Sequence, residues 1–151
     1  MKKGVDYIGV TCVFFCHDGR GRFLLHKRSN KCRDEVGNWD CGGGALELGE
    51  DFEPAVRREI KEEYSADVVD LKFLTTTNVL RKNGQENTHW VALIFAAKVL
   101  PEQVKIGEPD FMEEIGWFTE DNLPSPPHSQ LHRHFAYVRK SGLTKNQTQQ
   151  P

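Results

Sequence analysis

The sequence predicts an α/β domain, and three observations support this prediction. The chain has 151 residues, 38% of them hydrophobic and 28% charged, which suits one domain with a core of its own. Runs of β-branched and aromatic residues, separated by turns that contain glycine, are typical of β-strands. Two further segments carry apolar residues at helical spacing, which indicates amphipathic helices.

The N-terminal part predicts a β-hairpin. Residues 7–15 are rich in β-branched and aromatic side chains, and a turn separates them from a second apolar run at residues 23–25. No small-residue cleavage site follows the first run, so it is interpreted as a strand and not as a signal peptide. Residues 29–38 are polar and without periodicity, which predicts a loop that leads to Trp39 and the glycines at 42–44.

The clearest helix lies between Glu50 and Ser65. Its apolar residues fall four apart in one stripe: Phe52, Val56, Ile60 and Tyr64. Acidic residues at its start suit the positive end of the helix dipole, and Pro54 is harmless in a first turn. We therefore expect a helix of about four turns.

The second half of the chain predicts three more strands and a second helix. Residues 68–79 and 88–100 are long β-prone stretches joined by a turn at 81–84, and residues 115–118 form a shorter candidate strand. A helix is expected to start at Ser125, Pro126 and Pro127. Its apolar face is Leu131, Phe135 and Val138.

Beyond Lys140 the sequence offers almost no apolar surface. We therefore expect a domain at residues 1–140 and a disordered tail at 141–151.

Charge and cysteine content limit the partners. With 20 Lys and Arg against 22 Asp and Glu, the formal charge is −2, so we expect no nucleic-acid partner. No run reaches the roughly 18 apolar residues of a membrane-spanning helix, so we expect a cytoplasmic protein with no membrane partner.

The four cysteines, Cys12, Cys16, Cys32 and Cys41, show no paired spacing, which favours reduced thiols over a zinc site. The sequence leaves the oligomeric state open.

Three carboxylates crowd one face of the first predicted helix, since Glu59, Glu62 and Glu63 stand at i, i+3 and i+4. As a solvated face, they would be like charges on neighbouring positions, which costs about 0.2–0.5 kcal/mol per pair. A bound divalent cation would turn this repulsion between carboxylates into a favourable interaction with the cation. Because carboxylate oxygens are hard ligands, the cluster favours Mg²⁺ or Mn²⁺ shared with substrate phosphates.

The segment from Gly44 to Ala66 resembles the Nudix box, a glycine, five residues, a glutamate, seven residues and then R-E-U-x-E-E-x-G-U, where U is apolar. The matching residues are Gly44, Glu50, Arg58, Glu59, Ile60, Glu62, Glu63 and Ala66. Ser65 replaces the last glycine of the pattern. If the helix ends there in a left-handed conformation, the Cβ of Ser65 costs roughly 1 kcal/mol or more.

The resemblance extends over roughly residues 5–138. Residues 24–28 are similar to the family's strand that ends in arginine, and Trp39 to Gly44 to its W-x-x-P-G-G approach, with Gly42 in place of proline. Residues 108–124 are similar to its late E-P, W-F and L-P segment. The resemblance implies an α/β/α sandwich around a mixed β-sheet, in which the box forms a loop and a helix that hold a metal against a diphosphate.

Hydrolysis of a phosphoanhydride needs cations for the phosphate charge and a base for the attacking water. The resemblance implies these ligands of Mg²⁺, with Mn²⁺ as an alternative: Glu59, Glu62, Glu63 and the carbonyl of Gly43. It also implies that Arg58 orients Glu59 and that Glu50 is the structural partner of Arg58. The general base varies among family members, so we name Glu59, with Glu113 or Glu108 from the later loop as its alternatives.

Substrate-binding candidates lie outside the carboxylate face. Arg28 is a candidate phosphate clamp, because a guanidinium can hold two phosphate oxygens, and Gly44 is counted with the substrate site. Trp39 is a candidate for stacking on a base, as are Phe73 and Trp90, although aromatic residues beside strands are more often part of the core.

His128 and His132, four residues apart on the second predicted helix, are interpreted as a solvent-facing pair and less readily as a metal site.

The function implied is a Mg²⁺-dependent hydrolase of a small-molecule nucleotide, cutting a nucleoside triphosphate to a monophosphate and pyrophosphate. The alternative substrates are ADP-ribose or a nucleotide sugar. A module that binds nucleotides without cleaving them is a further alternative, which the retained carboxylates disfavour.

Overall fold

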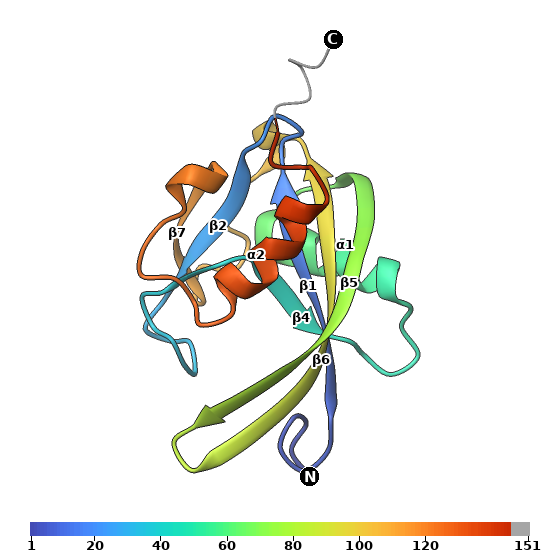
Figure 1. Cartoon of the computed structure of the whole chain (residues 1–151), viewed down its shortest axis with the longest axis vertical. Helices are drawn as coiled ribbons and strands as arrows, with labels where there is room; N and C mark the ends of the chain where they lie inside the picture. Colours follow the sequence, from blue (N-terminus) through green and yellow to red (C-terminus); the bar gives the residue numbers. More distant parts are fainter. Residues whose placement is uncertain (146–151) are drawn as a thin grey trace.

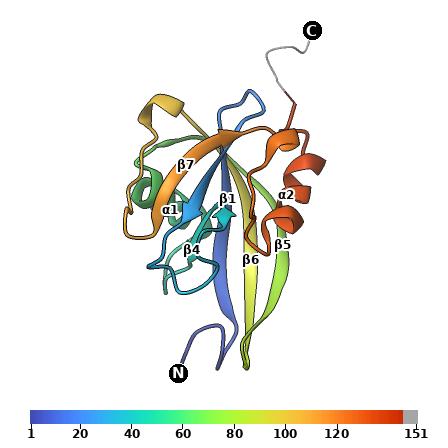
Figure 2. The ribbon, with the colours of Figure 1, turned by 90° about the vertical axis from the view of Figure 1, so that its left-hand side faces the viewer.

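The structure, a computed structural model, describes residues 1–145 as a mixed β-sheet with one helix on each face (Figure 1, Figure 2). The strands are β1 (Gly9–His17), β2 (Phe23–Arg28), β3 (Trp39–Asp40), β4 (Gly42–Ala45), β5 (Val68–Asn83), β6 (Glu86–Val99) and β7 (Met112–Phe118). The helices are α1 (Phe52–Tyr64) and α2 (Leu131–Lys140), with short 3-10 helices η1 (Pro101–Gln103) and η2 (Glu120–Asn122). This arrangement confirms the predicted α/β/α sandwich. Within residues 1–145, no helix is long and apolar enough to cross a membrane.

The sheet has the order β3-β2-β1-β6-β5, with β4 paired to β1 and β7 paired to β2. Strand β1 lies parallel to β6 from Gly9 to His17, whereas its pairing with β4 is antiparallel. The register of β4 puts Gly44 opposite Cys12. The glycine turn that precedes the box is thereby fixed against the central strand of the sheet.

The two faces of β1 belong to two separate cores, because side chains alternate along a strand. Phe14 packs in the cluster that α1 covers and Phe15 in the cluster that α2 covers. The predicted helical stripes supply the buried residues Val56, Ile60 and Tyr64 from α1 and Leu131, Phe135 and Val138 from α2. Phe52, the first residue of the α1 stripe, is 45% exposed and lies outside the core.

Three of the cysteines are buried in these cores. Cys12 and Cys16, four residues apart on β1, lie in the cluster beneath α1, and Cys41 lies in the other cluster. All are free thiols in the described part of the chain.

Helix α2 begins later than the sequence predicts. The helix starts at Leu131, and residues 126–128 run beside β3 instead. The N–H of Trp39 donates to the carbonyl of Pro126 at 2.8 Å, and the N–H of His128 donates to the carbonyl of Trp39 at 2.7 Å. Because proline lacks an N–H and these backbone groups already have partners on Trp39, residues 126–128 do not join the helix.

The predicted tail starts inside the described residues. Residues 141–145 form turns, and Leu143 is partly buried against the cluster beneath α2, so the packed part of the chain continues past Lys140. Residues 146–151 of the predicted tail lie outside the described residues.

Ser65 ends α1 in a left-handed conformation, with φ 57° and ψ 22°. A Cβ is disfavoured at this φ, so we expect Ser65→Gly to stabilise the fold by about 0.5–1 kcal/mol, measured from denaturation midpoints. Ser141 caps α2 with φ −74°, a conformation that any residue adopts. Ser141→Gly is therefore the matched control and should not stabilise. A lower midpoint for Ser65→Gly would contradict the expectation.

Candidate active site

Arg58 joins Glu50, which precedes α1, to two acidic residues of α1. Its Nε donates to Glu50 Oε2 at 2.7 Å and its Nη2 to Glu50 Oε1 at 2.9 Å. Its Nη1 donates to Glu59 Oε1 at 2.9 Å and lies 3.3 Å from Glu62 Oε2. The hydrogen bonds from Arg58 lower the pKa of Glu50. One guanidinium thus fixes the positions of Glu50 and Glu59, which are the contacts that an orienting role requires.

Glu59 and Glu63 are carboxylates that have lost much of their water. Burial raises the pKa of both above the ordinary value, and the charge of Glu59 raises that of Glu63 further. Glu63 is 7% exposed, and the N–H of Gly43 donates to its Oε2 at 3.3 Å. No cationic side chain pairs with Glu63 among residues 1–145.

Glycines let the box loop approach these carboxylates. A side chain at Gly44 would occupy the place of the Glu59 carboxylate, and a Cβ at Gly43 would lie 2.9 Å from the carbonyl of Cys12. Close approach to β1 and to α1 therefore requires glycine at both positions.

Glu108 lies beside the carboxylate face of α1. The N–H of Gly107 donates to the backbone carbonyl of Glu63 at 2.8 Å, which ties the loop after η1 to the end of α1. Burial and then the charge of Glu62 raise the pKa of Glu108. The charge of Glu108 in turn contributes to the raised pKa of Glu59 and Glu63.

Glu113 is placed differently. It lies on β7, where its Oε1 pairs with Lys27 Nζ at 3.2 Å. Of the residues considered for the general base, the structure brings Glu59 and Glu108 together, whereas Glu113 has its partner on β2.

The carboxylates suit a divalent cation by their chemistry. Among residues 1–145, no group of three metal-ligating side chains is assembled. However, a buried carboxylate without a cationic partner is unfavourable, and Glu63 is in that position beside Glu59. Oxygen donors of this kind fit Mg²⁺ or Mn²⁺, which would supply the missing positive charge.

A cavity of about 580 Å³ adjoins this cluster. Its lining joins Gly43, Gly44 and Glu63 to Arg28 of β2 and His134 of α2. Ligand pockets commonly measure about 300–1,000 Å³, so the cavity is large enough for a nucleotide.

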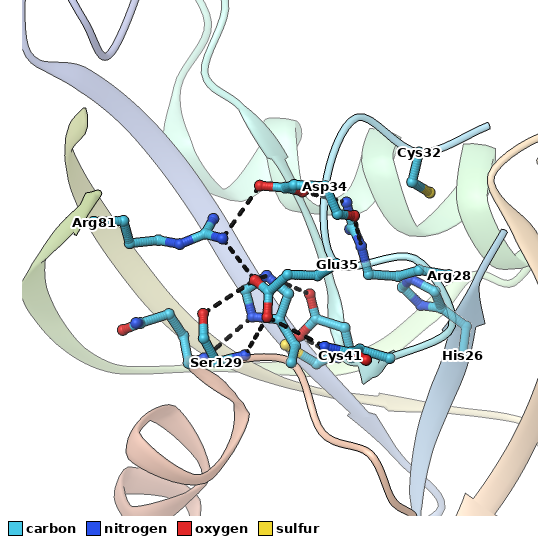
Figure 3. Close-up of polar contacts among 12 residues, drawn as sticks. His26, Arg28, Cys32, Asp34, Glu35, Cys41, Arg81 and Ser129 are labelled. Atoms are coloured by element: carbon cyan, nitrogen blue, oxygen red, sulfur yellow. Dashed lines mark hydrogen bonds and ion pairs between the residues drawn. The ribbon is translucent and has the colours of Figure 1, made fainter. Parts of the chain in front are cut away.

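Loop 29–38 carries two acidic residues that the sequence did not single out. Asp34 Oδ1 accepts from Arg28 Nη2 at 2.8 Å, and Asp34 Oδ2 lies 3.2 Å from Arg81 Nη2 (Figure 3). Glu35 Oε2 accepts from Arg81 Nη2 at 2.6 Å and from Ser129 Oγ at 3.0 Å. These contacts fasten the loop to β2, to β5 and to the segment before α2.

Arg81 is a cationic cavity residue that sequence reasoning missed. It lies on β5 and lines the same cavity as Arg28, and Asp34 contacts both guanidinium groups. Arg81 and Arg28 are far apart in sequence and no local pattern links them, so no signal in the sequence could have paired them.

The structure corrects the expectation that Trp39 stacks on a base. Trp39 is 8% exposed, its ring meets Phe118 edge-on with centroids 5.2 Å apart, and it does not line the cavity. Phe73 is 53% exposed on β5 and is likewise absent from the lining. Trp90 does line the cavity, and its ring fills the space beside Gly4 and Gly9.

His128 and His132 do not form the expected pair on one helix. His128 precedes α2, whereas His132 is exposed in its first turn. His128 Nδ1 accepts from the N–H of Gln130 at 3.1 Å, and its Nε2 lies 2.6 Å from Glu35 Oε2. His128 therefore helps to hold loop 29–38.

His26, buried on β2 beside the cavity, predicts an acid-sensitive fold. Its Nδ1 lies 2.7 Å from the hydroxyl oxygen of Tyr64. Burial, and then the charges of Arg28 and His128, lower the pKa of His26 to about 3. An unfolded histidine titrates at about 6.5, so the unfolded chain takes up a proton that the folded chain does not. The contribution of His26 to the free energy of unfolding should therefore be complete above about pH 6.5. It should be lost as the pH falls towards 3, by up to about 1.4 kcal/mol per pH unit.

His26→Asn keeps a hydrogen-bond acceptor for Tyr64 but does not titrate. We expect it to flatten the acid limb of a series of urea denaturation curves between about pH 6.5 and pH 4. His132→Asn changes an exposed histidine and serves as the control. Equal slopes for wild type and His26→Asn would contradict the expectation.

The chain is similar to proteins of a known family. The NUDIX domain family model matches residues 7–138. Nucleoside triphosphatase NudI of Escherichia coli is 28% identical over 122 residues, covering 76% of this chain and 83% of NudI. The 8-oxo-dGDP phosphatase NUDT18 of Mus musculus is 25% identical over 136 residues, covering 87% of this chain but 38% of the mouse protein. A crystal structure of a MutT NUDIX hydrolase from Burkholderia pseudomallei has a TM-score of 0.78 at 31% identity, covering 88% of this chain and 99% of that chain.

Proposed function

We propose that this chain, which belongs to the Nudix hydrolase family and is a pyrophosphohydrolase, cuts nucleoside triphosphates to monophosphates and pyrophosphate with Mg²⁺. The observation that carries the proposal is the cavity of about 580 Å³ that joins the carboxylate of Glu63 to two arginines, Arg28 and Arg81. Such a cavity offers metal ligands and phosphate-binding groups to one substrate. The name of NudI, nucleoside triphosphatase, supports this choice of substrate class.

The proposed ligands of Mg²⁺ are Glu59, Glu62, Glu63 and the carbonyl of Gly43. The ion would neutralise phosphate charge and lower the pKa of bound water. Arg58 holds Glu59 in place through the hydrogen bond of 2.9 Å, while Glu50 holds Arg58 from the other side.

The base that takes the proton from the attacking water is proposed among the carboxylates that cluster at α1. Glu108 has a pKa raised by burial and by Glu62, which moves it towards the operating pH. Glu59 has the same advantage but is engaged by Arg58. Glu108 is therefore the favoured base, with Glu59 as the alternative.

A nucleotide panel tests the proposal. The protein is incubated with Mg²⁺ and nucleoside triphosphates, nucleoside diphosphates, ADP-ribose or nucleotide sugars, and phosphate is counted after adding pyrophosphatase or alkaline phosphatase. Triphosphates should give monophosphate and pyrophosphate at the highest kcat/KM. Faster cleavage of ADP-ribose or a nucleotide sugar would select the alternative substrates. Binding of nucleotide without turnover would instead show a binding module.

Arg28 is expected to act mainly in binding. A guanidinium that holds phosphate in the ground state and transition state alike contributes to KM, so Arg28→Ala should raise KM with a smaller effect on kcat. A hydrogen bond to a charged group contributes about 1.5–3 kcal/mol, which corresponds to a rise in KM of about 10-fold or more. Arg20→Ala, at an exposed turn, is the control. An unchanged KM for Arg28→Ala would remove Arg28 from the site.

A further inference from the structure

His134 is a buried histidine of α2 that lines the cavity without a hydrogen-bond partner. His134 is only 4% exposed. Within residues 1–145, the Nε2 of His134 is the one fully buried side-chain nitrogen or oxygen that has no hydrogen-bond partner. A buried polar group in this state lowers stability relative to an apolar group of similar shape. The position therefore carries a stability cost that the fold itself does not explain.

The face of α2 on which His134 lies is otherwise apolar. Its buried neighbours are Leu131, Phe135 and Val138, which pack on the sheet. The adjacent Arg133 contacts Thr77 and Gln130, at 2.8 and 3.1 Å, and so makes no bond to His134. An apolar side chain would complete this face, whereas His134 places a polar ring in the wall of the cavity.

The protonation state of His134 indicates which ligand groups it suits. Burial is the main cause that lowers its pKa to about 4, and the charges of Arg133 and His128 act in the same direction. At neutral pH the ring is uncharged, with one nitrogen as a donor and the other as an acceptor. Such a ring matches an uncharged hydrogen-bonding group, whereas phosphate oxygens are better served by Arg28 and Arg81.

We propose that His134 is a specificity-determining residue that hydrogen-bonds the uncharged part of a bound nucleotide, either the edge of the base or a ribose hydroxyl. The inference rests on the proposed function, since it assumes that the cavity takes a nucleotide. The phosphates then lie at the carboxylates and arginines, and the nucleoside lies towards α2. The free-energy cost of leaving the His134 nitrogen unpaired is offset when the nucleotide forms a hydrogen bond with it.

The test combines stability with binding in the full chain. His134→Leu removes both ring nitrogens and keeps an apolar side chain, so its melting temperature should be equal to or above that of wild type. Its affinity for nucleoside monophosphates, measured by calorimetry without metal, should fall about tenfold. His134→Gln keeps a donor and an acceptor and should retain more affinity than His134→Leu. His132→Leu, an exposed histidine on the same helix, should bind as wild type does.

Two probes separate the ligand groups. If His134 contacts the base, His134→Leu should bind ribose 5-phosphate as wild type does and lose affinity only for complete nucleotides. If it contacts the ribose, affinity for ribose 5-phosphate should fall as well, while nucleotides lacking the ribose hydroxyls should bind equally to both proteins.

Different results would overturn the role of His134 and the proposed function. A wild-type protein that binds nucleotides, next to a His134→Leu protein that binds them equally well, would overturn this inference alone. The same holds if His134→Leu melts below wild type and His134→Gln binds no better than His134→Leu. A wild-type protein that neither binds nor cleaves any nucleotide of the panel would overturn the proposed function and this inference with it.

Discussion

Replacing Glu63 by glutamine is expected to remove most turnover while leaving the metal-free fold at least as stable as wild type. Glu63 is 7% exposed, and burial raises its pKa above the ordinary value, so its ionised form is disfavoured in the folded chain. Glutamine has nearly the same shape and no charge, and it still accepts from the N–H of Gly43. The substitution should therefore relieve the cost of a buried charge in the absence of metal and remove a proposed ligand in its presence.

The expected loss of turnover follows from the proposed role of Glu63 as a metal ligand. Changes to partners that merely orient metal ligands cost about 10–100-fold, so loss of a ligand should lower kcat/KM by roughly 100-fold or more. Mg²⁺ bound at the proposed site in the folded state should raise the melting temperature of wild type, and this rise should shrink in Glu63→Gln.

Melting curves in EDTA and in Mg²⁺, together with turnover, measure all three effects. Glu53→Gln makes the same change at an exposed position in the first turn of α1 and should leave turnover and the Mg²⁺ response unchanged. Retained turnover in Glu63→Gln would sink the proposed metal site. A solvated acidic face would give no selective response to Mg²⁺ in either protein.

Arg58→Lys is expected to lower both activity and stability, although it keeps the charge. The guanidinium of Arg58 serves Glu50 through two hydrogen bonds and Glu59 through a third. A lysine ammonium cannot match this planar fork, so one of the two carboxylates loses its partner. Leaving such a group without its hydrogen bond lowers stability, so the melting temperature should fall below that of wild type.

The effect of Arg58 on catalysis should appear in kcat. Arg58 is proposed to position Glu59 and not to bind substrate, so kcat should fall by roughly 100-fold with a smaller change in KM. The neighbouring Arg57 is exposed and donates to the carbonyl of Val68 at 3.2 Å, which a lysine can also do. Arg57→Lys is thus the matched control. A change confined to stability would restrict Arg58 to a structural role.

The local elements could be predicted from the sequence because their signals are local. The period of an α-helix sets which residues are neighbours, so the apolar stripe of α1 and the carboxylates Glu59, Glu62 and Glu63 followed from spacing alone. The fixed spacing of the box likewise indicated the family. The pattern has a glycine at the position of Ser65, so a left-handed conformation could be considered there from the sequence, and the structure has it.

The boundaries that failed were those decided by distant backbone partners. The prolines before α2 were expected to start a helix, yet Pro126 and His128 bond to Trp39 instead. Trp39 itself lies in the core because β3 pairs with β2 and is covered by Phe118. Neither contact has a signal within a few residues of the positions involved.

The composition of the site beyond α1 was decided only by the tertiary structure. Whether Glu108 or Glu113 lies beside the carboxylates depends on how the loop after η1 bonds to the end of α1. The bonds of Asp34 and Glu35 to Arg81 depend on where loop 29–38 meets β5. These pairs are set by strand order and register, which bring together residues that no periodicity in the chain relates. The sequence by itself therefore determined the family and the carboxylate face of α1, whereas the packing of the sheet decided which residues line the cavity beside that face.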